Sequence, residues 1–182
     1  MTGWIERGVI AWVDENRRED ESVLVYFRGV SLSDMVERLR ARHRPPFAFG
    51  VEPGAAEWGV VVHHLHNPLL GDFDGLDYRE LCSAGGELMV FVPNPCVAKA
   101  HGPHAFHFKD GQAVTSFFYE DPDVTGDRWP AEIAERVRVA GLDGETSDYE
   151  ALLTRAIGDH LGLPALDRGA LTVDRELIAS YF

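Results

Sequence analysis

Histidine is the reactive residue type that is most concentrated in this sequence of 182 residues. The segments HHLH and HGPHAFH together supply six of the eight histidines: His63, His64, His66, His101, His104 and His107. Side chains two residues apart on a strand share a face, so His64 and His66 could bind one metal ion. With His104 as a third ligand, they would form a zinc site with one open position. The alternative is that these are polar surface or half-buried side chains, because neither segment matches a named zinc motif.

Two cysteines offer a second kind of chemistry. Cys96 follows a proline and precedes the histidine-rich loop, a composition that could lower a thiol pKa and create a nucleophile. Cys82 fits an apolar helix position and is expected to pack as a small hydrophobe. The candidate catalytic residues are therefore His64, Cys96 and His107. No glycine-rich phosphate loop, GxSxG turn or cysteine-protease signature accompanies them, so we expect no cofactor, keep zinc as the alternative, and leave enzymatic activity open.

The elements that would position these residues centre on the segment 86–121. Its apolar run 88–92 does not alternate and is bounded by glycine and proline, which indicates a strand covered on both faces. Asp110-Gly111 lies between two further apolar runs and predicts a hairpin, because glycine adopts positive φ without steric cost. We expect antiparallel strands at 87–92, 105–109 and 112–119.

The remaining chain predicts helices at both ends and more strands between them. Helices are expected at 3–16, from Ser31 to before Pro45, from Pro130 to Gly141, from Ser147 to Gly162, and from near Thr172 to the C-terminus. Strands are expected at 23–27 and 58–65. Residues 45–56 and 67–77 carry proline and glycine turn signals and are expected to be irregular, with Asp77 capping a short helix. The pattern predicts one α+β domain over 1–182, with an antiparallel sheet of about five strands covered by N- and C-terminal helices.

The chain is strongly acidic, since 17 basic and 30 acidic residues give a formal net charge of −13. This charge disfavours nucleic acid and anionic membranes as partners, because phosphate groups repel an acidic surface. The charge is also uneven: residues 120–150 hold 10 acidic and 3 basic side chains. This run is either a solvated face that aids solubility or a docking surface for a basic protein. A small basic cluster lies elsewhere in the chain: Arg38, Arg40, Arg42 and Arg44.

Several features are typical of a cytoplasmic protein. No apolar run approaches the length of a membrane-spanning helix. The segment 1–20 lacks the basic start, long apolar centre and small-residue cleavage site of a signal peptide. A chain of this size with only Cys82 and Cys96 fits a reducing compartment.

The order of motifs along the chain carries a family resemblance. VYFRGVSLSDMVERL at 25–39 is followed by LCSAGGELMVFVPNPCVAKAHGPHAFHFKDGQAVTSFFYED at 81–121 and by a final helix that ends in LGLPAL. This order resembles an actinobacterial family catalogued only as domain of unknown function 6461. Its signature positions would correspond to Phe27, Arg28, Gly29, Asn94, Asp110 and Gly111, which look structural. The segment PPFAFGVEPGAAEW and the LGLPAL ending depart from the family pattern. The resemblance implies no established activity and gives no support to a metal site.

We therefore expect a cytoplasmic binding protein of a regulatory or immunity type, which uses an acidic surface to bind a basic macromolecular partner. The alternative is a small-molecule-binding protein or enzyme, with or without a zinc ion. Its pocket would be lined by four histidines on the sheet face: His64, His66, His104 and His107. A third hypothesis is self-association through an edge strand or through the aromatic C-terminus, Tyr181-Phe182. The sequence leaves the oligomeric state open.

Overall fold

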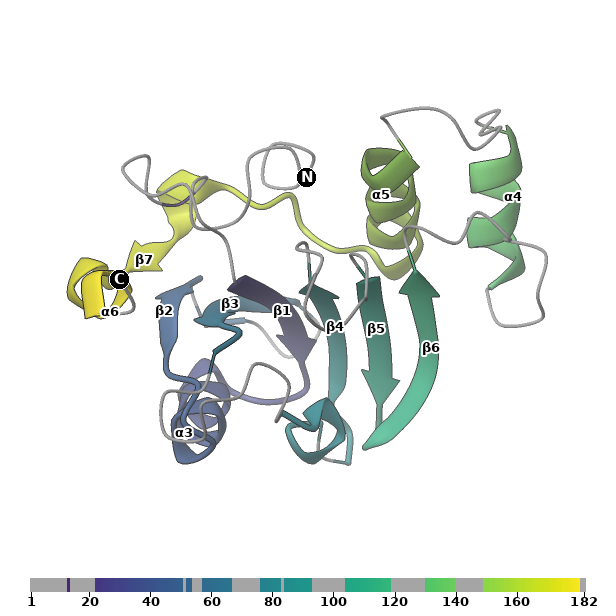
Figure 1. Cartoon of the computed structure of the whole chain (residues 1–182). Helices are drawn as coiled ribbons and strands as arrows, with labels where there is room; N and C mark the ends of the chain where they lie inside the picture. Colours follow the sequence, from purple (N-terminus) through teal and green to yellow (C-terminus); the bar gives the residue numbers. More distant parts are fainter. Residues whose placement is uncertain are drawn as a thin grey trace.

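The computed structural model describes residue 13 and residues 22–50, 52–53, 57–66, 76–82, 84–92, 104–118, 130–139 and 149–180. This part of the chain forms one antiparallel seven-stranded sheet with four α-helices and two 3-10 helices (Figure 1). The expected α+β class is confirmed, but the sheet has more strands than the five expected. The helix expected at 3–16 lies outside the described residues except for Val13, which is buried.

The strands are β1 (Ser22–Arg28), β2 (Pro46–Phe49), β3 (Gly59–His64), β4 (Glu87–Val92), β5 (His104–Lys109), β6 (Gln112–Phe118) and β7 (Thr172–Val173). The helices are α3 (Leu32–Ala41), α4 (Ala131–Val139), α5 (Tyr149–Leu161) and α6 (Arg175–Ser180), with 3-10 helices η1 (Tyr78–Glu80) and η3 (Arg168–Ala170). The strand order is β6-β5-β4-β1-β3-β2-β7. The first strand in the described sequence therefore lies in the middle of the sheet.

The predicted hairpin is confirmed. Strands β5 and β6 pair antiparallel around Asp110 and Gly111, which have φ values of 51° and 73°. Two consecutive residues with positive φ match the twist of the flanking strands and favour a tight turn. The short helix capped by Asp77 is also confirmed, because its carboxylate accepts a hydrogen bond from the backbone of Arg79 in η1.

One sequence prediction is wrong, and the start of the last helix differs from the expected one. Residues 45–56 were expected to be irregular, yet they contain β2, in which Phe47 is fully buried and Pro46 begins the strand, a position that proline tolerates. The last helix, expected to begin near Thr172, is present as α6 but begins at Arg175, because residues 172–173 form β7 against β2. Asp174 is the capping residue, since its carboxylate accepts a hydrogen bond from the backbone of Leu177.

The central strands β1, β3 and β4 are buried on both faces, which explains their continuous apolar runs. On the face that we call the α5 face, Leu24 and Tyr26 of β1 pack with Leu153 and Ile157 of α5. The opposite face, which we call the α3 face, carries the side chains that alternate with these. It includes Val23, Val25 and Phe27 from β1, Met35 and Leu39 from α3, and Tyr78 and Leu81 from the η1 segment.

Local signals in the sequence fix where α3 begins. Ser31 caps α3 by accepting a hydrogen bond from the backbone of Asp34 at 3.0 Å, as its position before an amphipathic run predicts. The helix follows a tight turn at Gly29, which has a φ of 77°. None of the helices in the described ranges is long and apolar enough to cross a membrane.

Candidate functional site

A polar cluster crosses three strands at one end of the α5 face, and we call it the Glu87 cluster. Arg28 of β1 pairs in register with Glu87 of β4, and His107 of β5 pairs with Met89, two residues further along the same face. Arg28 Nε donates a hydrogen bond to Glu87 Oε2 at 2.7 Å, and its guanidinium carbon lies 4.5 Å from the ring centroid of Trp58. The second carboxylate oxygen, Oε1, lies 2.8 Å from His107 Nε2.

Burial determines the charge state of this cluster. The side chains of Glu87 and His107 are only 8% and 10% exposed, whereas Arg28 is 35% exposed. Burial alone would raise the pKa of Glu87, but hydrogen bonds from Arg28 and His107 outweigh it and hold that pKa below its ordinary value. Burial lowers the pKa of His107, and the hydrogen bond to Glu87 opposes this shift only in part. The carboxylate is therefore ionised and the imidazole neutral at neutral pH.

A neutral His107 has one unprotonated ring nitrogen that can accept a proton or a hydrogen bond. Because the carboxylate of Glu87 can only accept, Nε2 carries the proton and donates it, and Nδ1 keeps a lone pair. No hydrogen bond to Nδ1 occurs among the residues that the structure describes. An imidazole that a carboxylate orients in this way can act as a general base, or its free nitrogen can accept a hydrogen bond from a ligand. The same contacts also satisfy a buried carboxylate, which is a structural role.

A second polar cluster lies on the α3 face and is more deeply buried. His63 Nδ1 donates to the backbone carbonyl of His64 at 2.9 Å, so its Nε2 accepts from the hydroxyl of Tyr78 at 3.0 Å. Burial lowers the pKa of His63 to about 3 and raises the pKa of Tyr78 above its ordinary value. The positive charge of Arg44, which is 1% exposed, adds to the shift at His63. Both rings are therefore neutral and connect β3 to the η1 segment.

The three histidines proposed as zinc ligands do not meet. His64 and His66 are neighbours, since their ring centroids are 6.3 Å apart and His66 donates its backbone N–H to His64 Nδ1. His104, however, lies on β5, and β1 and β4 separate it from β3. Three strand spacings amount to roughly 14 Å, well beyond the reach of a shared metal ion. Within the described ranges, no group of three histidine, cysteine or acidic side chains could hold a metal.

The histidines also divide between the two faces of the sheet. His104 pairs with Val92, which packs on the α3 face, and its ring contacts Phe106 at 4.7 Å between centroids. His107 lies on the α5 face. His64 follows Val62 at an alternating position and so belongs to the α5 face as well, but three strand spacings from His107. The structure therefore contains no single pocket lined by these histidines among its described residues.

The two cysteines differ in what can be said of them. Cys82 is a buried free thiol whose Sγ donates to the backbone carbonyl of Gly86 at 3.3 Å. Burial raises its pKa and so disfavours the reactive thiolate, and Cys82 packs in the apolar cluster of the α3 face, in agreement with the packing role expected for it. Cys96 lies outside the described residues, and its role as a nucleophile stays a prediction.

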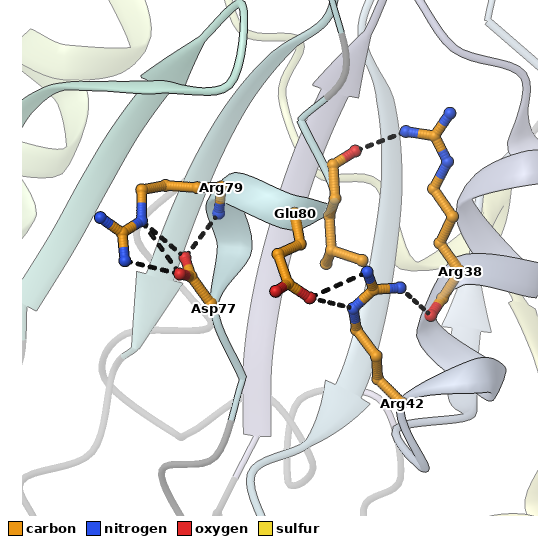
Figure 2. A network of polar contacts seen from close by, with 6 residues as sticks. Arg38, Arg42, Asp77, Arg79 and Glu80 are labelled. Carbon is orange, nitrogen blue, oxygen red and sulfur yellow. Dashed lines mark hydrogen bonds and ion pairs between the residues drawn. The ribbon is translucent and has the colours of Figure 1, made fainter.

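Part of the arginine cluster is used to hold α3 against the η1 segment (Figure 2). Arg38 donates from Nη1 to the backbone carbonyl of Leu81 at 2.7 Å. Arg42 donates to the carboxylate of Glu80 at 3.0 Å and to the backbone carbonyl of Arg38 at 3.2 Å. The contacts to Leu81 and Glu80 join residues that lie 43 and 38 positions apart in the sequence, so a structural role accounts for both arginines.

Charge is distributed unevenly between the described framework and the rest of the chain. The described residues contain 15 acidic and 12 basic residues, a formal charge of −3. The remaining residues contain 15 acidic and 5 basic residues, a formal charge of −10. Most of the net charge of −13 is therefore carried by segments that connect or precede the described elements.

Sequence reasoning missed Glu87 and Trp58 as members of the polar cluster. The sequence named Arg28 only as a signature position of the family resemblance, and the structure pairs it with Glu87 at the start of β4. A signal was present, because Arg28 ends one buried apolar run and Glu87 begins another. Opposite charges at the ends of two buried strands indicate that those ends lie side by side in an antiparallel pair.

Comparisons with known proteins add no assignment. No protein-family model matches the sequence, and no curated protein or solved structure matches it. The resemblance to domain of unknown function 6461 therefore stays a prediction from the motifs at 25–39 and 81–121.

Proposed function

We propose that the protein is a binding protein that docks a basic macromolecular partner through its acidic segments. The observation that carries this proposal is the acidic run at 120–150, where 10 acidic and 3 basic side chains give a formal charge of −7. A dense acidic surface raises the association rate with a basic partner and disfavours acidic competitors.

The attachment points of two acidic segments support a single docking region. Residues 119–129 connect β6 to α4, and residues 140–148 connect α4 to α5; together they contain 7 acidic residues and 1 basic residue. Helices α4 and α5 pack against each other and share an ion pair, with Arg136 Nη1 3.1 Å from Asp159 Oδ2. Both helices stand at the β6 end of the sheet (Figure 1). The two segments are thus attached to one side of the molecule.

Capture of a partner from a cell lysate tests this proposal. The bait would be the full chain, used at low and at moderate salt, beside a variant in which Glu120, Asp121, Asp123 and Asp127 are neutralised to Gln or Asn. We expect a basic protein to be retained by the unchanged bait at low salt and lost at moderate salt, because salt screens exposed charges. The neutralised bait should retain much less of it. Equal retention by the two baits would contradict the proposal.

A second candidate function is the binding or conversion of a small molecule. The lone pair on Nδ1 of His107, whose Nε2 is held by Glu87, favours it. A zinc-dependent version would need ligands that the described residues do not bring together. Native mass spectrometry of the untagged protein is the direct test. A retained small molecule that is lost in a His107→Gln variant, with the fold intact, would favour this candidate over the first.

A further inference from the structure

We propose that the η1 segment, residues 76–82, is an acid-sensitive cover on the α3 face of the sheet, which opens locally when His63 takes up a proton. This inference does not depend on the proposed function, because it concerns neither the acidic run nor a partner. It rests on the contacts that hold the segment in place and on the one ring nitrogen of His63 that can bind a proton.

The contacts of the η1 segment come from the sheet and from α3. The hydroxyl of Tyr78 donates to His63 Nε2 at 3.0 Å, and the ring of Tyr78 stacks on Phe108 of β5 with 6.3 Å between the centroids. Cys82 Sγ donates to the backbone carbonyl of Gly86. The contacts drawn between arginines and this segment in Figure 2 come from α3 and not from the sheet. The bond between Tyr78 and His63 is therefore the polar contact that joins the centre of the segment to β3.

One nitrogen of His63 determines how this contact responds to acid. Nδ1 donates to the carbonyl of His64 at 2.9 Å, so a further proton can add only at Nε2. While the segment is in place, the hydroxyl proton of Tyr78 occupies the lone pair of Nε2. Protonation therefore requires the hydroxyl to turn or to leave, and this requirement couples the charge of His63 to the position of η1.

The surroundings of His63 make a charged ring costly while the segment covers it. The side chain is 1% exposed, and its cross-strand neighbours on β1 and β2 carry no charge. The titratable groups that act on it are the guanidinium of Arg44, which is also 1% exposed, and the rings of His64 and Tyr78. Among the described residues, no carboxylate acts on His63 to offset a positive charge. Opening of the segment gives Nε2 to water instead, which removes the cost of a buried and unpaired charge.

The size of the effect follows from the pKa of His63 in the two states. Burial lowers this pKa to about 3 under the closed segment, and the ring should regain a pKa of about 6.5 once water reaches Nε2. The opening equilibrium should therefore rise about 30-fold between pH 7.5 and pH 5. A single helical turn is not stable in water without its packing, so the open segment should lose its backbone hydrogen bonds. These include the bonds that the amides of residues 80–82 donate to carbonyls of residues 77–79.

Hydrogen exchange of the full chain, measured residue by residue by NMR, tests the inference. Each amide rate is divided by the rate of an unstructured chain at the same pH, and the resulting protection in 80–82 is compared with that in 88–91 of β4. We expect protection in 80–82 to be at least about tenfold lower than in β4, to fall about 30-fold between pH 7.5 and pH 5, and to depend little on urea. If 80–82 share the protection and urea dependence of β4 at pH 5, acid acts through global unfolding and the inference is overturned. Protection in 80–82 that does not change with pH would overturn it as well.

Variants at the two ends of the hydrogen bond give a matched test. His63→Gln keeps an amide that can bond to the hydroxyl but cannot take up a proton, so the acid effect on 80–82 should shrink from about 30-fold to less than about threefold. Tyr78→Phe keeps the ring and removes the hydroxyl, so protection of 80–82 at pH 7.5 should fall about fivefold. His160→Gln, at an exposed histidine on α5, is the control and should keep the full acid effect.

An acid effect of about 30-fold that persists in His63→Gln would assign the response to another group and contradict the inference. If His63→Gln does not fold, the comparison of 80–82 with β4 in the unchanged protein decides between local opening and global unfolding by itself.

Discussion

Mild acid should destabilise this fold before most carboxylates titrate. His63 and His64 are buried and neutral, and burial lowers their pKa values to about 3 and about 4. In the unfolded chain both pKa values would return to about 6.5. The unfolded chain therefore binds more protons than the native protein as the pH falls below about 6.5. The free energy of unfolding is therefore highest above that pH. It declines as the pH falls toward the native pKa values of the two histidines.

The magnitude follows from the same pKa values. At pH 5, protonation of one histidine with a pKa of about 6.5 favours the unfolded chain by about 2 kcal/mol. We assign this amount to His63, because the native ring stays neutral at pH 5. His64 adds a contribution of the same sign and of at most similar size. A loss of about 2–4 kcal/mol is a large part of the stability of a typical domain.

Urea unfolding at pH 7.5, 6.5, 5.5 and 5 measures this loss directly. A matched control is His160→Gln, because His160 is an exposed histidine on α5. The variant His63→Gln should be less stable at pH 7.5 but should lose less stability on acidification than the unchanged protein. Unfolding free energies that agree within about 0.5 kcal/mol between pH 7.5 and pH 5 would refute the reasoning.

Two further predictions concern stability at neutral pH. Glu87→Gln removes the charged partner of Arg28 and should cost about 2–3 kcal/mol by urea unfolding, since it leaves a part-buried guanidinium without its carboxylate; a cost below about 0.5 kcal/mol would contradict this. Gly29→Ala should cost about 2–4 kcal/mol, because its φ is 77° and the new Cβ would overlap the carbonyl oxygen of Gly85. Gly162→Ala has a similar φ of 67° but open space around the new Cβ, so it should cost only about 1 kcal/mol, and equal costs would disprove the steric account.

Much of the sheet could be predicted because its signals are local. The β5–β6 hairpin follows from one Asp-Gly turn between apolar runs, and β4 follows from an unbroken apolar segment. Strand β2 could not be found in this way. It has four residues, begins with a proline and is stabilised by pairing with β3 and with β7, which lies more than 120 residues later. Such pairing leaves no periodic pattern in a short segment.

The grouping of histidines failed for a related reason. Strands β3 and β4 are successive in the sequence, which favours placing them side by side, but β1 lies between them in the sheet. That insertion separates His64 from His104 and His107. The same strand order brings Arg28 beside Glu87, which the sequence places 59 residues apart. The non-local strand order thus separates the histidines of the expected zinc site and brings together the residues of the Glu87 cluster.

The central claim, docking of a basic partner on the acidic segments, is tested most directly by anisotropy of a labelled lysine-rich peptide at increasing salt. Three proteins would be compared: the unchanged chain, a variant neutralised at Glu120, Asp121, Asp123 and Asp127, and a variant with the same change in charge at four acidic residues in 14–20. We predict affinity that falls with salt, a large loss in the first variant and a small loss in the second. Equal losses in both variants, or affinity that does not depend on salt, would contradict the account.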